Sequence, residues 1–198
     1  MIPISTINPA IPIPVAVALK ALARRSVDGS VQTACKHVAG NTADSSAVDD
    51  TNTEENFTTN VTIPSTFFRV GSLIKIIASG VYSTTGTPTL VFKFILNATT
   101  ILTFSARTCI NNASNQSWEI ETYFIVRTLG SSGTVMGWGT SKIATSAGIS
   151  TVESVVNNAS VSISTLSNQI ARISLTWSAA SASNTATCKN FLLFLSDY

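Results

Sequence analysis

Apolar and polar residues alternate along most of the chain from Phe57 onward, and this period of two limits the fold more than any other feature. Residues 118–129 and 169–177 show the alternation most clearly. In an extended strand, the first segment would turn Trp118, Ile120, Phe124 and Val126 inward and Glu119, Glu121 and Arg127 outward. The second would place on one face Ala171, Ile173, Leu175 and Trp177.

Short clusters of Gly, Asn, Ser and Thr separate about eight to ten such segments within residues 57–198. We expect strands at residues 57–63, 73–82, 89–96, 100–105, 118–129, 134–143, 152–156, 161–163, 169–177 and 185–195. Gly80 inside the second of these predicts a bulge or a close approach of another chain segment. The connections are too short for parallel crossovers, so the strands must pair antiparallel.

The pattern therefore predicts an all-β fold, an antiparallel two-sheet β-sandwich, most simply a jelly roll, with an extended N-terminal arm. An immunoglobulin-like sandwich is the alternative. Its Cys–Trp–Cys spacing is not met here, since Trp118 and Trp138 lie between Cys109 and Cys188 on strands that fit that pattern poorly.

Residues 1–56 differ in composition from the rest, and we predict two domains, an arm with a polar linker (1–56) and the sandwich (57–198). The first residues are apolar but interrupted by Pro3, Pro9, Pro12 and Pro14, which suits an extended arm lying on another surface. Without a basic start, this segment is not expected to be an export signal. Residues 15–25 could form one short helix. Residues 41–56 are acidic and polar and predict a solvated linker.

Charge argues against several classes of partner. Charged residues are 11% of the chain, against about 25% in an average soluble protein. The net charge of +2 is too small for a nucleic-acid-binding protein. No stretch reaches 18 uninterrupted apolar residues, so no membrane span is expected.

Titratable side chains do not suggest an enzyme. The single histidine, His37, lies in the arm, which disfavours a Ser-His-Asp or Cys-His device. Glu119 and Glu121 share one face of a strand and could act as a glycosidase pair, but two solvated carboxylates are the simpler interpretation. We predict no catalytic, cofactor-binding or metal-binding residues and no cofactor. The alternative for a metal is the group of linker acids, Asp44, Asp49, Asp50, Glu54 and Glu55.

The three cysteines, Cys35, Cys109 and Cys188, have no zinc-type spacing and predict partly buried thiols. A bridge between Cys109 and Cys188 is the alternative, and it requires the strands that carry them to be neighbours.

Aromatic side chains leave a carbohydrate site open as an alternative. A stacking platform could be built from Trp118, Trp138, Trp177, Tyr82 and Tyr123. Trp118 and Trp177 are in phase with apolar neighbours, however, and are expected in the core. Trp138 is flanked by Gly137 and Gly139 and is the best candidate for an exposed ring, in a ligand site or a subunit contact.

A sandwich with few charges is poorly protected against association, and a proline-interrupted apolar arm needs a partner surface. Both features favour a structural subunit that forms a homo-oligomer. Residues 1–60 carry four basic and six acidic side chains. This acidic balance argues against a shell-forming capsid protein whose arm binds the genome.

Three segments resemble strands and turns that recur in virion proteins of tailed bacteriophages: residues 70–90, 118–135 and 175–185. They include the runs VGSLIKIIASGVYS, RTLGSSGTV and LTWSAASASNT, and the likeness extends over about residues 61–195. The resemblance implies a β-sandwich component of a capsid or tail, such as a head fibre, decoration protein or tail appendage, often trimeric.

We therefore expect a non-enzymatic virion structural protein, assembled in the host cytoplasm. Residues 1–56 would contact other virion proteins. The alternatives are a carbohydrate- or receptor-binding module that contacts a host surface glycan, and a shell-forming jelly-roll capsid protein.

Overall fold

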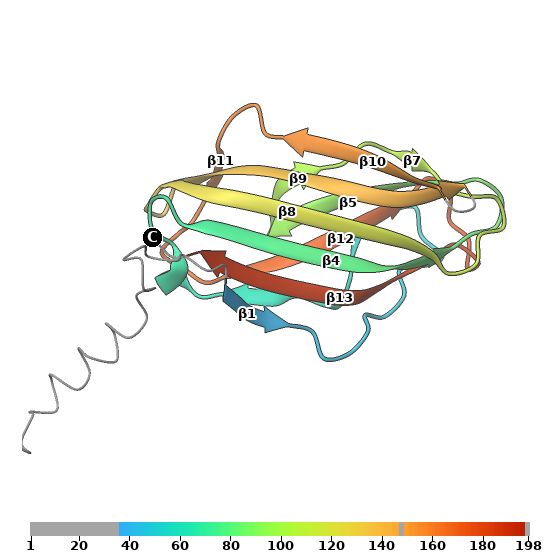
Figure 1. Cartoon of the computed structure of the whole chain (residues 1–198), viewed down its shortest axis with the longest axis horizontal. Helices are drawn as coiled ribbons and strands as arrows, with labels where there is room; N and C mark the ends of the chain where they lie inside the picture. Colours follow the sequence, from blue (N-terminus) through green and yellow to red (C-terminus); the bar gives the residue numbers. More distant parts are fainter. Residues whose placement is uncertain (1–35, 147–148, 197–198) are drawn as a thin grey trace, which may run out of the picture. The chain divides into compact units, whose positions relative to one another are not determined.

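A computed structural model of the protein describes residues 36–146 and 149–196 (Figure 1). Strands dominate these residues, and their only helical element is a single 3-10 turn, η1 (Ser65–Phe67). The strands are β1 (Lys36–Gly40), β2 (Glu55–Asn56), β3 (Val61–Ile63), β4 (Leu73–Ser83), β5 (Thr89–Leu96), β6 (Thr99–Thr103), β7 (Arg107–Thr108), β8 (Gln116–Thr128), β9 (Gly133–Ser146), β10 (Ile149–Val156), β11 (Val161–Ile163), β12 (Gln169–Trp177) and β13 (Thr185–Ser196). No described segment is a helix long and apolar enough to cross a membrane.

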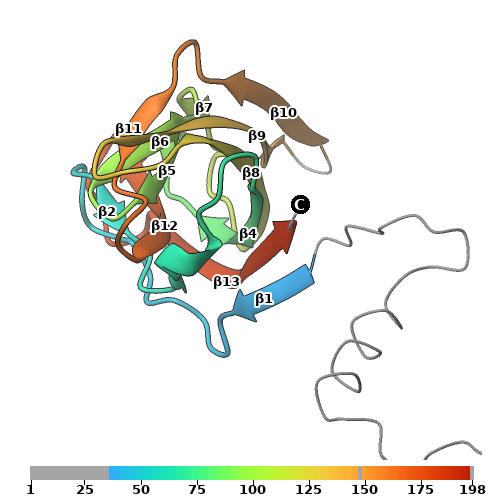
Figure 2. The ribbon, with the colours of Figure 1, turned by 90° about the vertical axis from the view of Figure 1, so that its left-hand side faces the viewer.

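The strands form two antiparallel sheets, which confirms the predicted β-sandwich. The larger sheet has the order β1-β13-β4-β8-β9-β10, with β11 also paired to β9. The smaller has the order β2-β12-β5-β6, with β3 beside β12 and β7 beside β5. Figure 2, which looks along the strands, shows the two sheets facing each other around a common interior. The narrower jelly-roll topology stays a prediction.

The interior is filled by the side chains that the alternation predicted to point inward. Trp118 is 1% exposed and stacks on Phe57, with ring centroids 5.3 Å apart, and packs against Phe92 at 4.8 Å. Trp177 and Tyr82 are equally buried. Buried aromatic rings of this size contribute much of the apolar surface removed from water on folding.

Gly80 is required by a close approach between neighbouring strands, as its place in the sequence predicted. A Cβ atom at this position would lie 1.9 Å from the carbonyl oxygen of Thr187 and 2.8 Å from the Trp118 ring. On the partner strand, the register shifts between Cys188 and Asn190, so the bulge belongs to β13. Gly80 therefore allows the bulged β13 and the Trp118 indole to share one narrow space.

Residues 41–56 differ from the predicted solvated linker, because they pack along the sandwich between β13 and β12. Val48 is 2% exposed and pairs with Ala186 of β13. Its carbonyl oxygen also accepts a hydrogen bond from Trp177 Nε1 of β12, at 3.2 Å. β2 then joins the smaller sheet. Backbone hydrogen bonds and the buried Val48 side chain hold this polar segment in place. Because neither produces a periodic pattern of apolar residues, the sequence did not predict this packing.

The sandwich consequently begins before Phe57. Of the strand expected at residues 57–63, only Val61–Ile63 forms a strand, β3, whereas β2 ends at Asn56. The described residues, 36–146 and 149–196, belong to one compact unit. Residues 1–35 of the predicted arm and linker (1–56), including the helix expected at 15–25 and Cys35, lie outside the described residues.

The two ends of the sandwich differ in chemistry. We call proximal the end formed by loops 64–72, 129–132 and 164–168 with the start of β1 and the end of β13 (left in Figure 1). Val70, Leu129 and Leu166 are 63%, 50% and 69% exposed there. The distal end, formed by loops 84–88, 109–115 and 178–184, carries none of the large exposed apolar side chains found in residues 36–146 and 149–196. Distal loops are joined by polar bonds such as Thr85 N–H to Asn184 Oδ1 at 3.0 Å.

Candidate functional site: the outer face of the large sheet

A row of aromatic and basic side chains crosses the outer face of the larger sheet. Strand register places His37, Phe194, Lys75, Tyr123 and Trp138 side by side on β1, β13, β4, β8 and β9. We call these five residues the outer-face row. They meet because the side chains of directly opposite residues in neighbouring strands stand about 5 Å apart on one face.

Ring contacts join neighbouring residues at both ends of the row. Tyr123 and Trp138 are stacked, with ring centroids 5.4 Å apart and planes inclined by 7°. The Lys75 ammonium lies 5.2 Å from the Tyr123 centroid. Because β8 lies between β4 and β9, Lys75 and Trp138 cover opposite sides of the Tyr123 ring. At the other end of the row, His37 packs edge-on against Phe194 at 5.4 Å.

One carboxylate neutralises the centre of the row. Glu121 pairs with the Lys75 ammonium and accepts a hydrogen bond from the Tyr123 hydroxyl. The hydrogen bond from Lys75, followed by the one from Tyr123, lowers the pKa of Glu121. In return, the hydrogen bond with Glu121 raises the pKa of Lys75 and of Tyr123. The three groups form a closed cluster with no net charge at neutral pH.

Apolar side chains flank the row on both sides. Leu73, Ile125 and Met136 form the next row toward the proximal end, and Ile77 and Leu192 lie on the other side. All five are half-buried, because each is shielded only by its neighbours on the sheet. Together with the outer-face row they form what we call the apolar half of the outer face.

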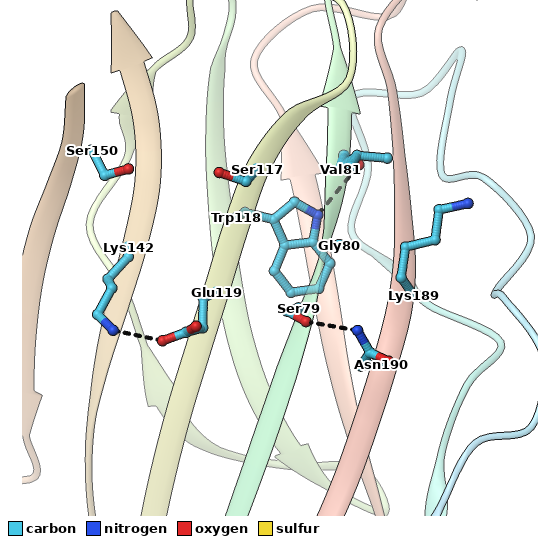
Figure 3. A pocket seen from close by; sticks show the side chains of 10 residues that line it. All are labelled: Ser79, Gly80, Val81, Ser117, Trp118, Glu119, Lys142, Ser150, Lys189 and Asn190. Atoms are coloured by element: carbon cyan, nitrogen blue, oxygen red, sulfur yellow. Dashed lines mark hydrogen bonds and ion pairs between the residues drawn. The ribbon is translucent and has the colours of Figure 1, made fainter. Parts of the chain in front are cut away.

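The distal half of the same face is polar and holds a shallow hollow of about 370 Å³. Figure 3 shows its lining, in which Lys142 Nζ donates to Glu119 at 2.7 Å and Asn190 Nδ2 donates to Ser79 Oγ at 3.2 Å. Gly80 and Trp118 also line the hollow, although the Trp118 side chain is 1% exposed and packs in the core. The remaining lining residues are Val81, Ser117, Ser150 and Lys189.

A second hollow, of about 300 Å³, lies at the proximal end. Phe68, Leu129 and Leu166 give it an apolar wall, and the hydroxyls of Ser65, Thr66 and Thr165 complete it. Thr165 ties two of its loops together by accepting a hydrogen bond from Gly130 N–H at 2.8 Å. The exposed leucines are thus held on ordered loops.

The two predicted glutamates are on one face, as expected, but each has its own lysine. Glu119 pairs with Lys142, and Glu121 pairs with Lys75. Both carboxylates lie on an open sheet surface and are engaged by a cation. The hydrogen bond from Lys75 lowers the pKa of Glu121, which is the opposite of the shift expected for a general acid.

The linker acids are dispersed along the sandwich edge. Asp44 pairs with Lys189 at 2.5 Å, and Glu54 pairs with Lys93 at 2.5 Å. Lys93 and Ser174 also donate hydrogen bonds to Glu54, and its pKa is lowered although desolvation opposes this. Within residues 36–146 and 149–196, no three His, Cys, Asp or Glu side chains gather as metal ligands would.

Cys109 and Cys188 are free, buried thiols, so the alternative of a bridge between them is wrong. Burial raises the pKa of the Cys109 thiol to about 12 and also raises that of Cys188. Both therefore stay protonated and unreactive at neutral pH.

Of the five aromatic residues considered for a carbohydrate platform, Trp118, Trp177 and Tyr82 belong to the core. Trp138 and Tyr123 lie on the outer face, half-buried. Lys75, Phe194 and the flanking apolar residues were not predicted from the sequence to be part of this surface. The available signal was that segments 73–83 and 185–196 are apolar at outward as well as inward positions.

Comparison with known proteins does not show a family for this chain. No protein-family model matches the chain, and no curated protein matches it. Among solved structures, the chain is similar to the CBM2 module of an evolved Dit protein of Lactobacillus casei BL23 phage J-1, at 10% identity and a TM-score of 0.37, over 76% of each chain. This likeness is too distant to carry an argument about function.

Proposed function

We propose that this protein is a non-enzymatic structural subunit of a bacteriophage virion, associated with the capsid or the tail. The observation that carries the proposal is the chemical difference between the two ends of the sandwich. Val70, Leu129 and Leu166 are exposed at the proximal end, where Lys36 also begins β1. Exposed apolar clusters on folded proteins mark interaction sites.

The difference between the two ends suggests how the subunit would be oriented on the particle. The proximal end, where the chain continues toward residues 1–35, would face the particle. The distal end, with hydrogen-bonded loops built around Thr84, Thr85 and Asn184, would face solvent. The resemblance of residues 61–195 to phage virion proteins supports the same interpretation. Trimeric assembly and the choice between head and tail are finer parts of this proposal.

The test is a deletion of residues 1–25, followed by particle assembly and purification. We expect the shortened protein to keep its strand signal in circular dichroism, because β1 begins at Lys36, but to be missing from purified particles. Leu129→Ser with Leu166→Ser in the full chain should also reduce incorporation. Normal incorporation of the truncated protein would contradict an anchoring role for residues 1–25.

A carbohydrate- or receptor-binding module is the second candidate, favoured by the hydroxyl-rich distal hollow. Ser79, Ser117 and Asn190 could form hydrogen bonds with a polyhydroxylated ligand there. A glycan array tests this directly, with Trp138→Ala as a variant of the outer-face row. The absence of any bound glycan, or unchanged binding by both Asn190→Ala and Trp138→Ala, would exclude the candidate sites. A shell-forming capsid protein remains a third candidate, disfavoured by the acidic balance of residues 1–60.

A further inference from the structure

We propose that the apolar half of the outer face binds a second copy of this chain. The inference rests on the proposed function and deepens it by naming the surface through which copies of the subunit meet. It concerns the outer-face row and its flanking residues Leu73, Ile77, Ile125, Met136 and Leu192.

The apolar half of the outer face is more apolar than a solvent-exposed sheet face usually is. In an antiparallel sheet with one solvated face, outward positions are normally polar. Here β4 turns Leu73 and Ile77 outward, although it also turns Ile74 and Ile76 into the core. β13 does the same with Leu192 and Phe194. Strands that are apolar on both sides are typical of sheets covered on both sides.

The charges at the centre of the apolar half neutralise each other. Lys75 and Glu121 are the charged groups at the centre of this surface, and they pair with each other and with Tyr123. The centre of this surface therefore carries no unpaired Lys, Arg, Asp or Glu side chain, and the exposed Arg127 lies at its proximal border. Its best complement is another neutral apolar surface of the same size, and a second copy supplies one. Aromatic residues such as Tyr123, Trp138 and Phe194 are enriched at such contacts.

The apolar half is large enough for a weak but specific protein contact. The row lies on five strands, which together cover a width of about 24 Å, and with the rows beside it extends about 20 Å along the strands. This gives a footprint of about 500 Å² on each copy, or about 1,000 Å² in total, near the lower limit for a specific interface. At the edge of the sheet, Val156 lies opposite Trp138 and is 68% exposed, so the apolar surface continues onto β10. A contact of this size predicts an association that depends on protein concentration.

Sedimentation of the full-length chain over a range of concentrations tests the proposal. Ile125→Lys and Leu192→Lys place a charge within the apolar half. Ser117→Lys is the matched control for Ile125→Lys, because it adds the same charge on the same face of β8 in the polar half. We expect the parent and Ser117→Lys to associate alike, and the two apolar-half variants to show at least about tenfold weaker association.

Tryptophan fluorescence gives a second readout that reports on this face. Trp118 and Trp177 are 1% exposed, whereas Trp138 is half-buried on the outer face. Quenching by acrylamide should therefore report mainly on Trp138 among the three tryptophans. We expect quenching to rise on dilution of the parent, and to be high at all concentrations in Ile125→Lys. Trp138→Phe should remove this concentration dependence.

Three outcomes would overturn the proposal. One is a parent that stays a single chain at every concentration. Another is self-association of Ile125→Lys and Leu192→Lys that is as strong as that of the parent and of Ser117→Lys. The third is a single chain whose Trp138 is nevertheless shielded, since residues 1–35 would then cover the face. If the protein associates through this face but is absent from purified phage particles, only the proposed function is overturned.

Discussion

The indole of Trp138 stacks on the ring of Tyr123, with 5.4 Å between centroids and 7° between planes. The opposite side of Tyr123 faces the Lys75 ammonium. Tyr123 therefore has no free ring face on which a sugar could stack, and the pair is better suited to pack its ring edges against a flat apolar partner. This relationship is why we place a protein contact, rather than a carbohydrate site, on the apolar half of the outer face.

The two tryptophans of β8 and β9 should differ strongly in their effect on stability. Trp118→Ala removes a ring packed between Phe57 and Phe92 and is expected to lower the free energy of unfolding by about 3–5 kcal/mol. Trp138→Ala removes one half-buried stacking partner and should lower the free energy of unfolding by about 1 kcal/mol. Urea unfolding at low protein concentration measures both. Equal losses would show that the assignment of inner and outer faces is wrong.

Gly80→Ala is expected to destabilise the protein by about 3 kcal/mol or more, because the added methyl group collides with the Thr187 carbonyl oxygen. Gly86→Ala is the control. Gly86 has φ of +72° but no atom within 4 Å of the added Cβ, so only the conformational cost remains, about 1 kcal/mol. The difference between the two midpoints in thermal unfolding checks the close approach at Gly80. A Gly80→Ala protein as stable as Gly86→Ala would contradict it.

Val48→Asp should lower the free energy of unfolding by about 3 kcal/mol, since it buries a charge between β13 and Trp177. Ala47→Asp adds the same charge to a neighbouring exposed position and should change it by less than about 0.5 kcal/mol. Chemical unfolding of the two variants compares them. If neither changes stability, residues 41–56 behave as the solvated linker that the sequence suggested.

Stability should fall between about pH 9 and pH 12. Burial raises the pKa of Tyr82 to about 12 and that of Cys109 to about 12. Both groups are neutral acids in the folded protein, and their pKa values are higher there than in the unfolded chain. Each therefore contributes its full stabilisation at any pH below its pKa in the unfolded chain. The benefit is lost as the pH rises toward the folded values, because only the unfolded chain ionises. The loss is expected to reach roughly 3 kcal/mol for each group.

Unfolding measured across this pH range in the parent and in Cys109→Ala separates the two contributions. Cys109→Ala should have a shallower alkaline decline, since one ionising group is gone. An identical slope in both proteins would mean that the Cys109 thiol does not contribute.

The inner faces of the strands could be predicted from the sequence because the pleat gives them a fixed period. Trp118, Ile120 and Phe124 alternate with Glu119 and Glu121, and the structure places them on opposite faces as expected. The close approach at Gly80 was also readable, since a glycine within an apolar strand indicates missing space for a side chain.

The outer-face row could not be predicted, because it depends on which strands are neighbours. Lys75, Tyr123 and Phe194 lie far apart in the chain, and only the order β13-β4-β8 brings them together. Val48 was missed for a related reason, since a single apolar residue in a polar segment has no period. Its burial depends on pairing with Ala186, which is distant in sequence.

The mass of the full-length protein in solution, measured by sedimentation equilibrium at rising concentration, tests the central claim most directly. The account predicts a multiple of 20.8 kDa that increases with concentration, because a neutral apolar sheet face and an apolar proximal end favour association. A constant mass of one chain at every concentration would contradict the claim that this sandwich is built to join a larger assembly.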